Sequence, residues 1–432
     1  MVDVYVPYVT RVEGHGNIVV REKDGEIEIR WEIAESPRFY EAMVRGKPWD
    51  VVTHITSRIC GICAAGHTLA SINAIEDAFG TKPTLQTWRM RKLLSHGGMI
   101  QSHALHAFFL ALPDFVGAPS IIAMAPTHTE AVLAAVRLKK LGNDIADLIG
   151  GRAVHPCSAL VGGFGRIPTE KELLQLRSKL QQGLADIKLM VDVYRSVLPN
   201  IPKFERKTEY ISLYWEKEYP WIDGDVVSSE AGVVSYRDYL KFVHEWVKPY
   251  STAKRAKNVF TSYAVGALAR VNNNFDQLCD SAKEAAEILQ YKRPCYNPFY
   301  NNICQVIETV HCIEDSIRTI DQMLADGLKD EGIQKPSVRA GRGVGAVEVP
   351  RGILFHDYTF DETGHMVCAN LVIPTNQNHE NIEDDFRAWV PKMIQEGKTD
   401  EEIAFNLEML VRSYDPCISC STHTIRVEFK RG

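Results

Sequence analysis

Arg58-Ile-Cys60-Gly-Ile-Cys63-Ala-Ala-Gly-His67 carries a C-x-x-C pair at the beginning of a helical pattern. From Cys63 to Phe79, apolar residues recur at intervals of three and four positions, which is typical of an amphipathic helix. If Cys60 opens the first turn, then Cys60, Cys63 and His67 share one face of that helix. The segment therefore predicts two thiols and an imidazole at a helix N-terminus, where the helix dipole favours thiolates.

A second C-x-x-C pair lies near the other end of the chain, in Asp415-Pro-Cys417-Ile-Ser-Cys420-Ser-Thr-His423. Pro416 cannot continue a helix, so we expect this pair on a turn just after the preceding helix. Four thiolates can thus converge from opposite ends of the sequence. The spacing alone leaves three interpretations open: a structural four-cysteine zinc site, a thioredoxin-like dithiol, and the soft-metal chemistry of iron–sulfur or of nickel and iron.

Two observations argue against the zinc and dithiol interpretations. Structural zinc sites usually close small modules, whereas a chain of 432 residues with 45% hydrophobic content can fold unaided. A dithiol site would need only one pair in a βαβ setting. The other six cysteines stand singly, and we expect them to be buried structural thiols: Cys157, Cys279, Cys295, Cys304, Cys312 and Cys368.

Composition and charge exclude other classes of function. With 49 basic and 55 acidic residues the net charge is −6, and no dense cluster of Lys and Arg suggests a nucleic-acid partner. The first residues show no secretory signal, and no apolar stretch reaches the roughly 18 residues that span a bilayer. We therefore expect a cytoplasmic protein without direct membrane insertion, whose ten cysteines are thiols and metal ligands.

The patterning predicts a mainly α protein with a small N-terminal antiparallel β-hairpin, an α+β fold. The hairpin is expected over residues 16–33, around the turn Asp24-Gly25. Helices are expected over 85–112 and 127–149, around 316–323, and after the capping boxes Thr169/Glu172 and Thr399/Glu402. Residues 336–354 suggest a loop with short strands, and 366–374 suggest a buried strand. No repeat or linker is visible, so residues 1–432 are expected to form one interlocked domain.

The two cysteine segments together resemble the paired signatures of [NiFe] hydrogenase large subunits. Further segments match that family in order across nearly the whole chain: Arg11-Val-Glu13-Gly-His15, Arg38-Phe-Tyr-Glu41, Leu112-Pro-Asp114, Pro350-Arg351-Gly352 and Leu371-Val-Ile-Pro374-Thr375. The resemblance implies the fold of these subunits, with a central helical bundle. It also implies their activity, which interconverts H2 with protons and electrons.

The resemblance implies a nickel–iron centre with four cysteine ligands. Cys60 and Cys417 would be terminal nickel ligands, and Cys63 and Cys420 would bridge nickel to an iron that also carries CO and two cyanides. His67 would form a hydrogen bond with a bridging sulfur. Three more residues would lie beside the cofactor, with Pro350 shaping the wall next to the iron: Pro350, Pro374 and Thr375.

The resemblance also assigns roles to charged residues. Arg351 would hang over the open metal position, held there by Asp114 and Asp415. Glu13 would be the first relay that takes a proton from Cys417 towards the surface. A magnesium ion near the C-terminus would be bound by three groups: Glu41, the backbone carbonyl of Leu371, and His423.

Partners follow from the same resemblance. Beyond the four cysteines, nothing resembles an iron–sulfur ligand set, so an iron–sulfur small subunit is required, and further subunits with iron–sulfur and flavin are expected. They would pass electrons to a soluble acceptor such as NAD(P) or ferredoxin, as in cytoplasmic bidirectional hydrogenases. Residues 424–432 extend past the usual maturation cleavage point, as an uncleaved extension or a retained tail. A non-catalytic relative of the complex I quinone-site subunit, or a zinc-stabilised scaffold, remains the alternative.

Overall fold

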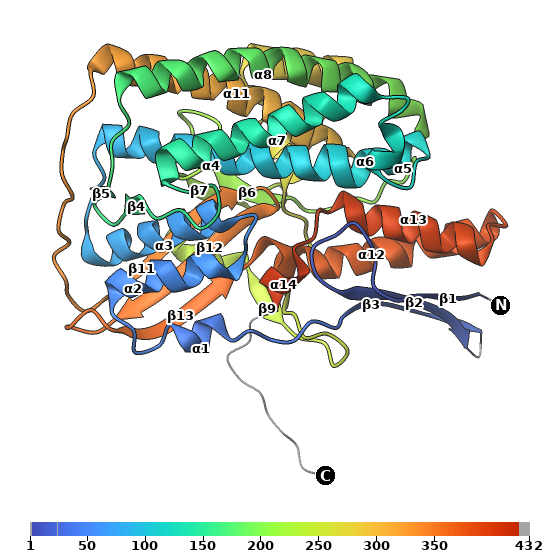
Figure 1. The fold of residues 1–432 in the computed structure, drawn as a ribbon. Helices are drawn as coiled ribbons and strands as arrows, with labels where there is room; N and C mark the ends of the chain where they lie inside the picture. Colours follow the sequence, from blue (N-terminus) through green and yellow to red (C-terminus); the bar gives the residue numbers. More distant parts are fainter. Residues whose placement is uncertain (1, 24, 423–432) are drawn as a thin grey trace, which may run out of the picture.

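A bundle of four long helices forms one side of the molecule (Figure 1). The computed structural model describes residues 2–23 and 25–422. The bundle consists of α4 (Leu85–His103), α7 (Thr129–Gly150), α8 (Glu170–Val197) and α11 (Tyr300–Asp326), which pack on one another. Glycines bring α4 and α7 close together, because a Cβ at Gly142 would overlap the backbone of Gln101. The predicted central helical bundle is therefore confirmed.

The predicted helix over 85–112 is helical throughout but not uniformly α. After α4 the chain continues through a π-helical segment, η2 (Ala104–Ala111), into α5 (Leu112–Val116). Around this transition two buried histidines face α11: His103 Nε2 lies 2.8 Å from Glu308 Oε2, and His106 Nδ1 lies 2.6 Å from Gln305 Oε1. Single-turn π segments often occur at functional sites.

The N-terminal sheet confirms the predicted hairpin. Its strands β1 (Asp3–Val6), β2 (Gly16–Lys23) and β3 (Glu26–Ile33) are antiparallel in the order β1-β2-β3, although Asp24 of the predicted turn lies outside the described residues. The sheet packs against two C-terminal helices, α12 (Pro374–Gln395) and α13 (Asp400–Ser413). Segments from the two ends of the chain therefore meet (Figure 1).

A second three-stranded sheet corrects the prediction for residues 336–354. Residues 336–340 carry no helix or strand, as the loop prediction expects. The following residues form long strands, because β11 (Gly341–Val349) and β12 (Gly352–Phe360) are nine residues each, and β13 (Met366–Val372) completes the antiparallel sheet. The glycines that suggested a loop serve packing instead. A Cβ at Gly345 would overlap the Ala70 carbonyl of α3 (Ala64–Phe79), so glycine lets the strand lie directly on that helix.

The remaining elements are short. The helices are α1 (Tyr40–Met43), α2 (Trp49–Thr56), η1 (Ser57–Ile59), α6 (Ile121–Met124), η3 (Leu198–Asn200), η4 (Tyr236–Lys241), α9 (Ala267–Asn274), η5 (Phe275–Gln277), α10 (Asp280–Ile288) and α14 (Ile418–Ser421). The strands are β4 (Ala159–Leu160), β5 (Gly163–Phe164), β6 (Ile211–Tyr214), β7 (Asp225–Ser228), β8 (Gly232–Val234), β9 (His244–Trp246) and β10 (Arg255–Lys257). Both predicted capping boxes are present, at Thr169 and Thr399.

The cysteines outside the two pairs are only partly as predicted. Cys295, Cys304 and Cys312 are buried, but Cys279 is half-buried, and Cys157 and Cys368 are exposed. Cys368 follows the exposed Val367 in β13, at the point where the pairing of this strand with β12 is irregular. Within residues 2–23 and 25–422, no helix is both long enough and apolar enough to cross a membrane.

The contact between α3 and β11 gives a test of the fold. We expect Gly345→Ala to lower the free energy of unfolding by about 1–3 kcal/mol, because the new methyl group forces α3 away from the sheet. Thermal melting measures the effect. Gly165→Ala is the control, since a Cβ there meets its nearest atom at an ordinary 3.7 Å. Equal melting temperatures for the two variants would contradict the packing described.

Candidate metal centre

The first cysteine pair lies just before α3 rather than within it. Cys60 has an extended backbone (φ −145°, ψ 140°), and Cys63 is the residue that precedes the helix. The prediction that Cys60 opens the helix is therefore wrong. The physical reason is that the backbone N–H groups of Ile62 and Cys63 turn back to the Cys60 sulfur, at 3.2 and 3.3 Å.

The second pair lies on a turn after α13, as predicted. Cys417 precedes the short helix α14, and its backbone N–H donates to Thr375 Oγ1 at 3.0 Å. Asp415, two residues earlier, has a φ of 51°, a left-handed conformation that Asp tolerates better than most residues. This turn directs both sulfurs towards the first pair.

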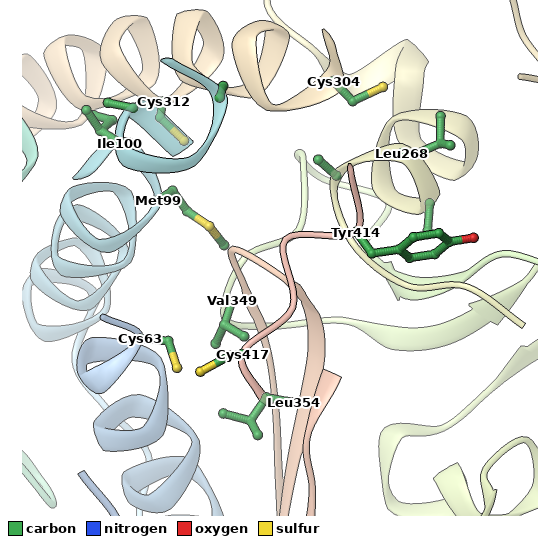
Figure 2. Close-up of a cluster of buried hydrophobic side chains, with 14 of the residues drawn as sticks. Cys63, Met99, Ile100, Leu268, Cys304, Cys312, Val349, Leu354, Tyr414 and Cys417 are labelled. Carbon is green, nitrogen blue, oxygen red and sulfur yellow. The ribbon is translucent and has the colours of Figure 1, made fainter. Parts of the chain in front are cut away.

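The four sulfurs form one buried cluster. Cys60 Sγ lies 3.6 Å from Cys417 Sγ, and the sulfurs of Cys60, Cys63 and Cys420 all lie within 4.8 Å of one another. Cys417 and Cys420 are in disulfide contact. Figure 2 shows the sulfurs of Cys63 and Cys417 pointing toward one another from opposite segments. Each of the four residues is at most 6% exposed, so the cluster is shielded from water.

This donor set fits soft metals. Thiolates select ions such as nickel, iron and zinc, and sulfurs this close together can bridge two ions. Apolar side chains line the surroundings, with Val349 and Leu354 beside the pair in Figure 2. Val349 packs so tightly on α3 that a Cβ at Gly66 would overlap it.

The first pair shares its protons unequally. The hydrogen bond from the Cys63 thiol lowers the pKa of Cys60, and although burial raises it, Arg351 and backbone N–H groups lower it further, to about 7. The same hydrogen bond and burial raise the pKa of Cys63 well above its ordinary value. One thiolate is therefore formed near neutral pH, ready to bind a cation.

Arg351 is buried beside this cluster and is held by Asp415. Its Nε donates to the Asp415 carbonyl at 2.6 Å, and Nη2 donates to Asp415 Oδ1 at 2.9 Å. Burial lowers the pKa of Arg351, but the charges of Asp415, Cys60 and Cys63 outweigh this effect and raise it. Its Nη1 is buried and has no hydrogen-bond partner among the described residues. Within that part of the chain, one nitrogen of the guanidinium is thus a free donor.

The prediction that Asp114 also holds Arg351 is wrong for this structure. Asp114 forms an ion pair with Arg11, and its Oδ2 accepts a hydrogen bond from Arg412 Nε at 2.7 Å. Both carboxylate oxygens of Asp114 therefore accept from arginines other than Arg351. The resemblance did not reveal this because Arg11 and Arg412 approach Asp114 from distant segments of the chain.

Glu13 lies beside the second cysteine pair. Its backbone carbonyl accepts from Ile418 N at 2.9 Å, and its carboxylate accepts from the backbone N–H (3.1 Å) and the hydroxyl of Ser419. A carboxylate oxygen of Glu13 and the sulfurs of Cys417 and Cys420 all lie within 4.8 Å of one another. The predicted juxtaposition of this carboxylate and Cys417 is present.

The other residues assigned to the cofactor surroundings are buried near these segments. His67 Nδ1 lies 3.0 Å from His356 Nε2, and its predicted contact with a sulfur stays a prediction. Pro350 lies in the turn between β11 and β12, and Pro374 begins α12. Thr375 holds the Cys417 backbone as described above.

The predicted magnesium ligands can be checked only in part, since His423 lies outside the described residues. Glu41 is buried, and its Oε1 accepts from Leu371 N (2.9 Å) and from Lys254 Nζ (3.0 Å). Glu41 Oε2 is buried without a hydrogen-bond partner among the described residues. One carboxylate oxygen thus fits a hard cation, but Lys254 already neutralises the other, which the sequence did not suggest.

Sequence reasoning also missed a group of buried charged residues near the centre. Arg270 donates to Glu308 and Glu348, and Glu308 also lies within hydrogen-bond distance of His103. The neutral Gln305 on the same helix as Glu308 donates to Asp415 Oδ2 at 3.1 Å. A signal was available, because Gln305, Glu308 and Asp315 recur at helical spacing among the apolar residues of α11.

Comparisons with known proteins identify the family to which the chain belongs. Residues 38–147 and 246–423, more than half of the chain, match the model of a family described as nickel-dependent hydrogenase. The chain belongs to the nickel-dependent hydrogenase family. Its predicted membership is confirmed, and with it the assignment as an oxidoreductase acting on H2.

The relatives of this hydrogenase cover it almost completely. It is 33% identical to the alpha subunit of sulfhydrogenase 1 from Pyrococcus furiosus, over 99% of this chain and 100% of that protein. It is 31% identical to a subunit of the F420-non-reducing hydrogenase from Methanothermobacter marburgensis, over 98% and 95%. An NAD+-reducing [NiFe]-hydrogenase solved in the H2-reduced state has a TM-score of 0.89 at 25% identity, over 98% and 100% of the two chains.

The shared proton of Cys60 and Cys63 predicts a pH dependence of the metal-free hydrogenase. The folded pair loses its first proton near pH 7, below the ordinary value of 9.0, and its second well above 9.0. The free energy of unfolding should therefore rise by roughly 2 kcal/mol from about pH 7 to 9 and fall again above 9. Thermal melting across this range measures it, and Cys60→Ser should abolish the rise. Parallel profiles for the two proteins would refute it.

Proposed function

We propose that this chain is the catalytic subunit that holds a nickel–iron centre on Cys60, Cys63, Cys417 and Cys420. The observation that carries the proposal is the convergence of four buried sulfurs from both ends of the chain, beside an arginine with a free donor. Cys60, Cys63, Cys417 and Cys420 would together hold the nickel and an iron that carries CO and two cyanides. When bound, this centre supplies the reversible heterolytic cleavage of H2.

The residues of the chain supply the proton route. Once the disulfide contact with Cys420 is reduced, Cys417 Sγ can receive a proton, and the Glu13 carboxylate lies within 4.8 Å to take it over. Glu13 is itself fixed by the backbone N–H and hydroxyl of Ser419, so its orientation towards the sulfurs is set before any reaction. A positioned carboxylate of this kind would direct the proton away from the buried cluster.

Arg351 would act over the cluster through its free Nη1. Asp415 holds the other nitrogens, so that this donor can polarise a small molecule in a water-excluded site. Because Asp114 is engaged with other arginines, its role would be to hold Arg11 and Arg412 rather than Arg351. His67, Pro350, Pro374 and Thr375 would line or support the centre.

The electrons released from H2 would have to leave this chain through partner subunits. One relative is named as the alpha subunit of its enzyme, which supports the proposal that this chain, too, works with an iron–sulfur small subunit. We propose further subunits with iron–sulfur and flavin and a soluble acceptor such as NAD(P) or ferredoxin, supported by the likeness to an NAD+-reducing enzyme. In this proposal the chain is one interlocked domain in the cytoplasm; residues 424–432, for which the sequence suggests a tail, lie outside the described residues.

Metal analysis separates this proposal from the zinc alternative. The complex purified from its source should contain about one nickel per chain, and its infrared spectrum should show bands of metal-bound CO and cyanide. We expect Cys63→Ala and Cys420→Ala to lose the nickel and these infrared bands, and the control Cys157→Ala to keep them, because Cys157 is exposed. Stoichiometric zinc without nickel would contradict the proposal.

We also propose a magnesium site near the C-terminus. The supporting observation is Glu41 Oε2, a buried carboxylate oxygen that has no hydrogen-bond partner in the described part of the chain. We expect Glu41→Gln to lower the magnesium content of the purified complex and to leave its nickel content unchanged. Lys257→Met is the control, because Lys257 is an exposed residue of β10. Equal magnesium in all three proteins would exclude Glu41 as a ligand.

The proton route predicts a strong effect of one substitution. We expect Glu13→Gln to lower the rate of H2 oxidation by about 10²–10⁴-fold with nickel content retained, because the amide cannot accept the proton. Glu35→Gln is the control, since Glu35 follows the same N-terminal sheet and pairs with the exposed His15. Dye reduction under H2 measures both. Full activity in Glu13→Gln would exclude Glu13 as the relay.

A further inference from the structure

Arg270 of α9 is fully buried and uses every one of its N–H donors. Nε and Nη2 donate to the two carboxylate oxygens of Glu308, at 2.6 and 2.7 Å. Nη1 donates to Glu348 Oε2 and to the Val349 carbonyl, both at 2.9 Å. Nη2 also donates to the Pro350 carbonyl at 3.1 Å. Five donors in one plane thus meet two carboxylates and two backbone carbonyls.

The two carbonyls belong to the residues immediately before Arg351. They lie at the end of β11 and in the turn to β12, so Arg270 fixes the backbone from which the Arg351 side chain extends. The start of α9 packs on the same turn. A Cβ at Gly266 would lie 3.3 Å from the Arg351 carbonyl, and a Cβ at Gly352 would overlap Val265.

Glu308 connects this anchor to the helical bundle. Its Oε2 lies 2.8 Å from His103 Nε2, and its Oε1 accepts from Tyr219 at 2.7 Å. Glu308 is on α11 and His103 on α4, so two long helices hold the carboxylate that holds Arg270. A buried guanidinium with two carboxylates is costly unless all its donors are satisfied, and here they are.

We propose that Arg270 is a positioning residue for Arg351: it anchors the backbone of the β11–β12 turn to the bundle, while Asp415 anchors the guanidinium. This inference rests on the proposed role of Arg351 over the metal centre. Lysine could not replace Arg270, because an ammonium has three donors and no planar fork. With the turn released, Arg351 Nη1 would no longer be held at a fixed point over the sulfurs.

A double-mutant cycle in the purified complex tests the proposal. We expect Arg270→Lys to lower kcat for H2 oxidation about tenfold or more, because small displacements of a positioned group are costly. Arg351→Lys should lower kcat further, and the double variant should match Arg351→Lys, since Arg270 acts only through Arg351. Nickel content should stay unchanged throughout.

Two measurements separate positioning from a general loss of stability. Amide hydrogen exchange of the peptide 346–352 should quicken in Arg270→Lys but not in Arg91→Lys. Arg91 is the matched control because it forms a similarly buried two-point pair with Glu76, about 20 Å further along α3 from Cys63. Arg91→Lys should also keep its kcat within about twofold, as expected for a pair remote from the reacting groups.

Specific outcomes overturn the proposal. If Arg270→Lys lowers kcat by the same factor in the Arg351→Lys background as in the wild type, Arg270 does not act through Arg351. Unchanged kcat in Arg351→Lys would instead refute the proposed role of Arg351 itself. If Arg270→Lys does not fold, Glu348→Gln enters the same cycle, because it removes one of the carboxylates that hold Arg270. Loss of nickel in both variants would make Arg270 a core brace and refute the proposal.

Discussion

The structure depends on bringing two cysteine pairs together across nearly the whole chain. Cys60 and Cys417 are 357 positions apart, yet their sulfurs lie 3.6 Å from each other in a buried cluster. The C-terminal turn is fixed there by backbone and side-chain hydrogen bonds from three directions. Ile418 N donates to the Glu13 carbonyl, Cys417 N to Thr375 Oγ1, and Asn376 Nδ2 to the Ser421 carbonyl. A metal centre closed in this way can form only after this C-terminal turn has docked.

The second constraint on the fold is that the buried charge of Arg351 needs partners. Arg351 beside the sulfurs is held by Asp415, and Asp415 in turn accepts from Gln305 of α11. A buried arginine without such partners would be strongly destabilising, since an unpaired charge is costly to take out of water. The fold therefore surrounds the sulfur cluster with paired groups, and among the described residues it leaves Arg351 Nη1 without a hydrogen-bond partner.

Much of this could be predicted from the sequence, for physical reasons. Helix periodicity, the two capping boxes and the β2–β3 hairpin are local signals, and each element forms where its residues predict it. The site residues could be named because their motifs match a family, which periodicity alone would not have achieved. The β11 strand is hard to tell from a loop because Gly343 and Gly345 suit turns equally well, and only contact with α3 decides between the two.

Long-range contacts explain the remaining errors. The engagement of Asp114 by Arg11 and Arg412 joins residues 103 and 298 positions apart, which no local pattern encodes. The spacing of Cys60, Cys63 and His67 favours Cys60 as the start of a helix. Spacing alone cannot show that the Cys60 sulfur accepts from the backbone N–H groups that follow it, which places Cys60 before the helix. Lys254 beside Glu41 gave no signal at all, since isolated lysines are mostly exposed.

X-ray absorption at the nickel edge of the purified complex tests the central claim most directly, namely that four thiolates from the two ends of this chain bind one metal centre. The account predicts a nickel first shell dominated by sulfur at about 2.3 Å, as is usual for metal–thiolate bonds. A first shell of nitrogen and oxygen would contradict it.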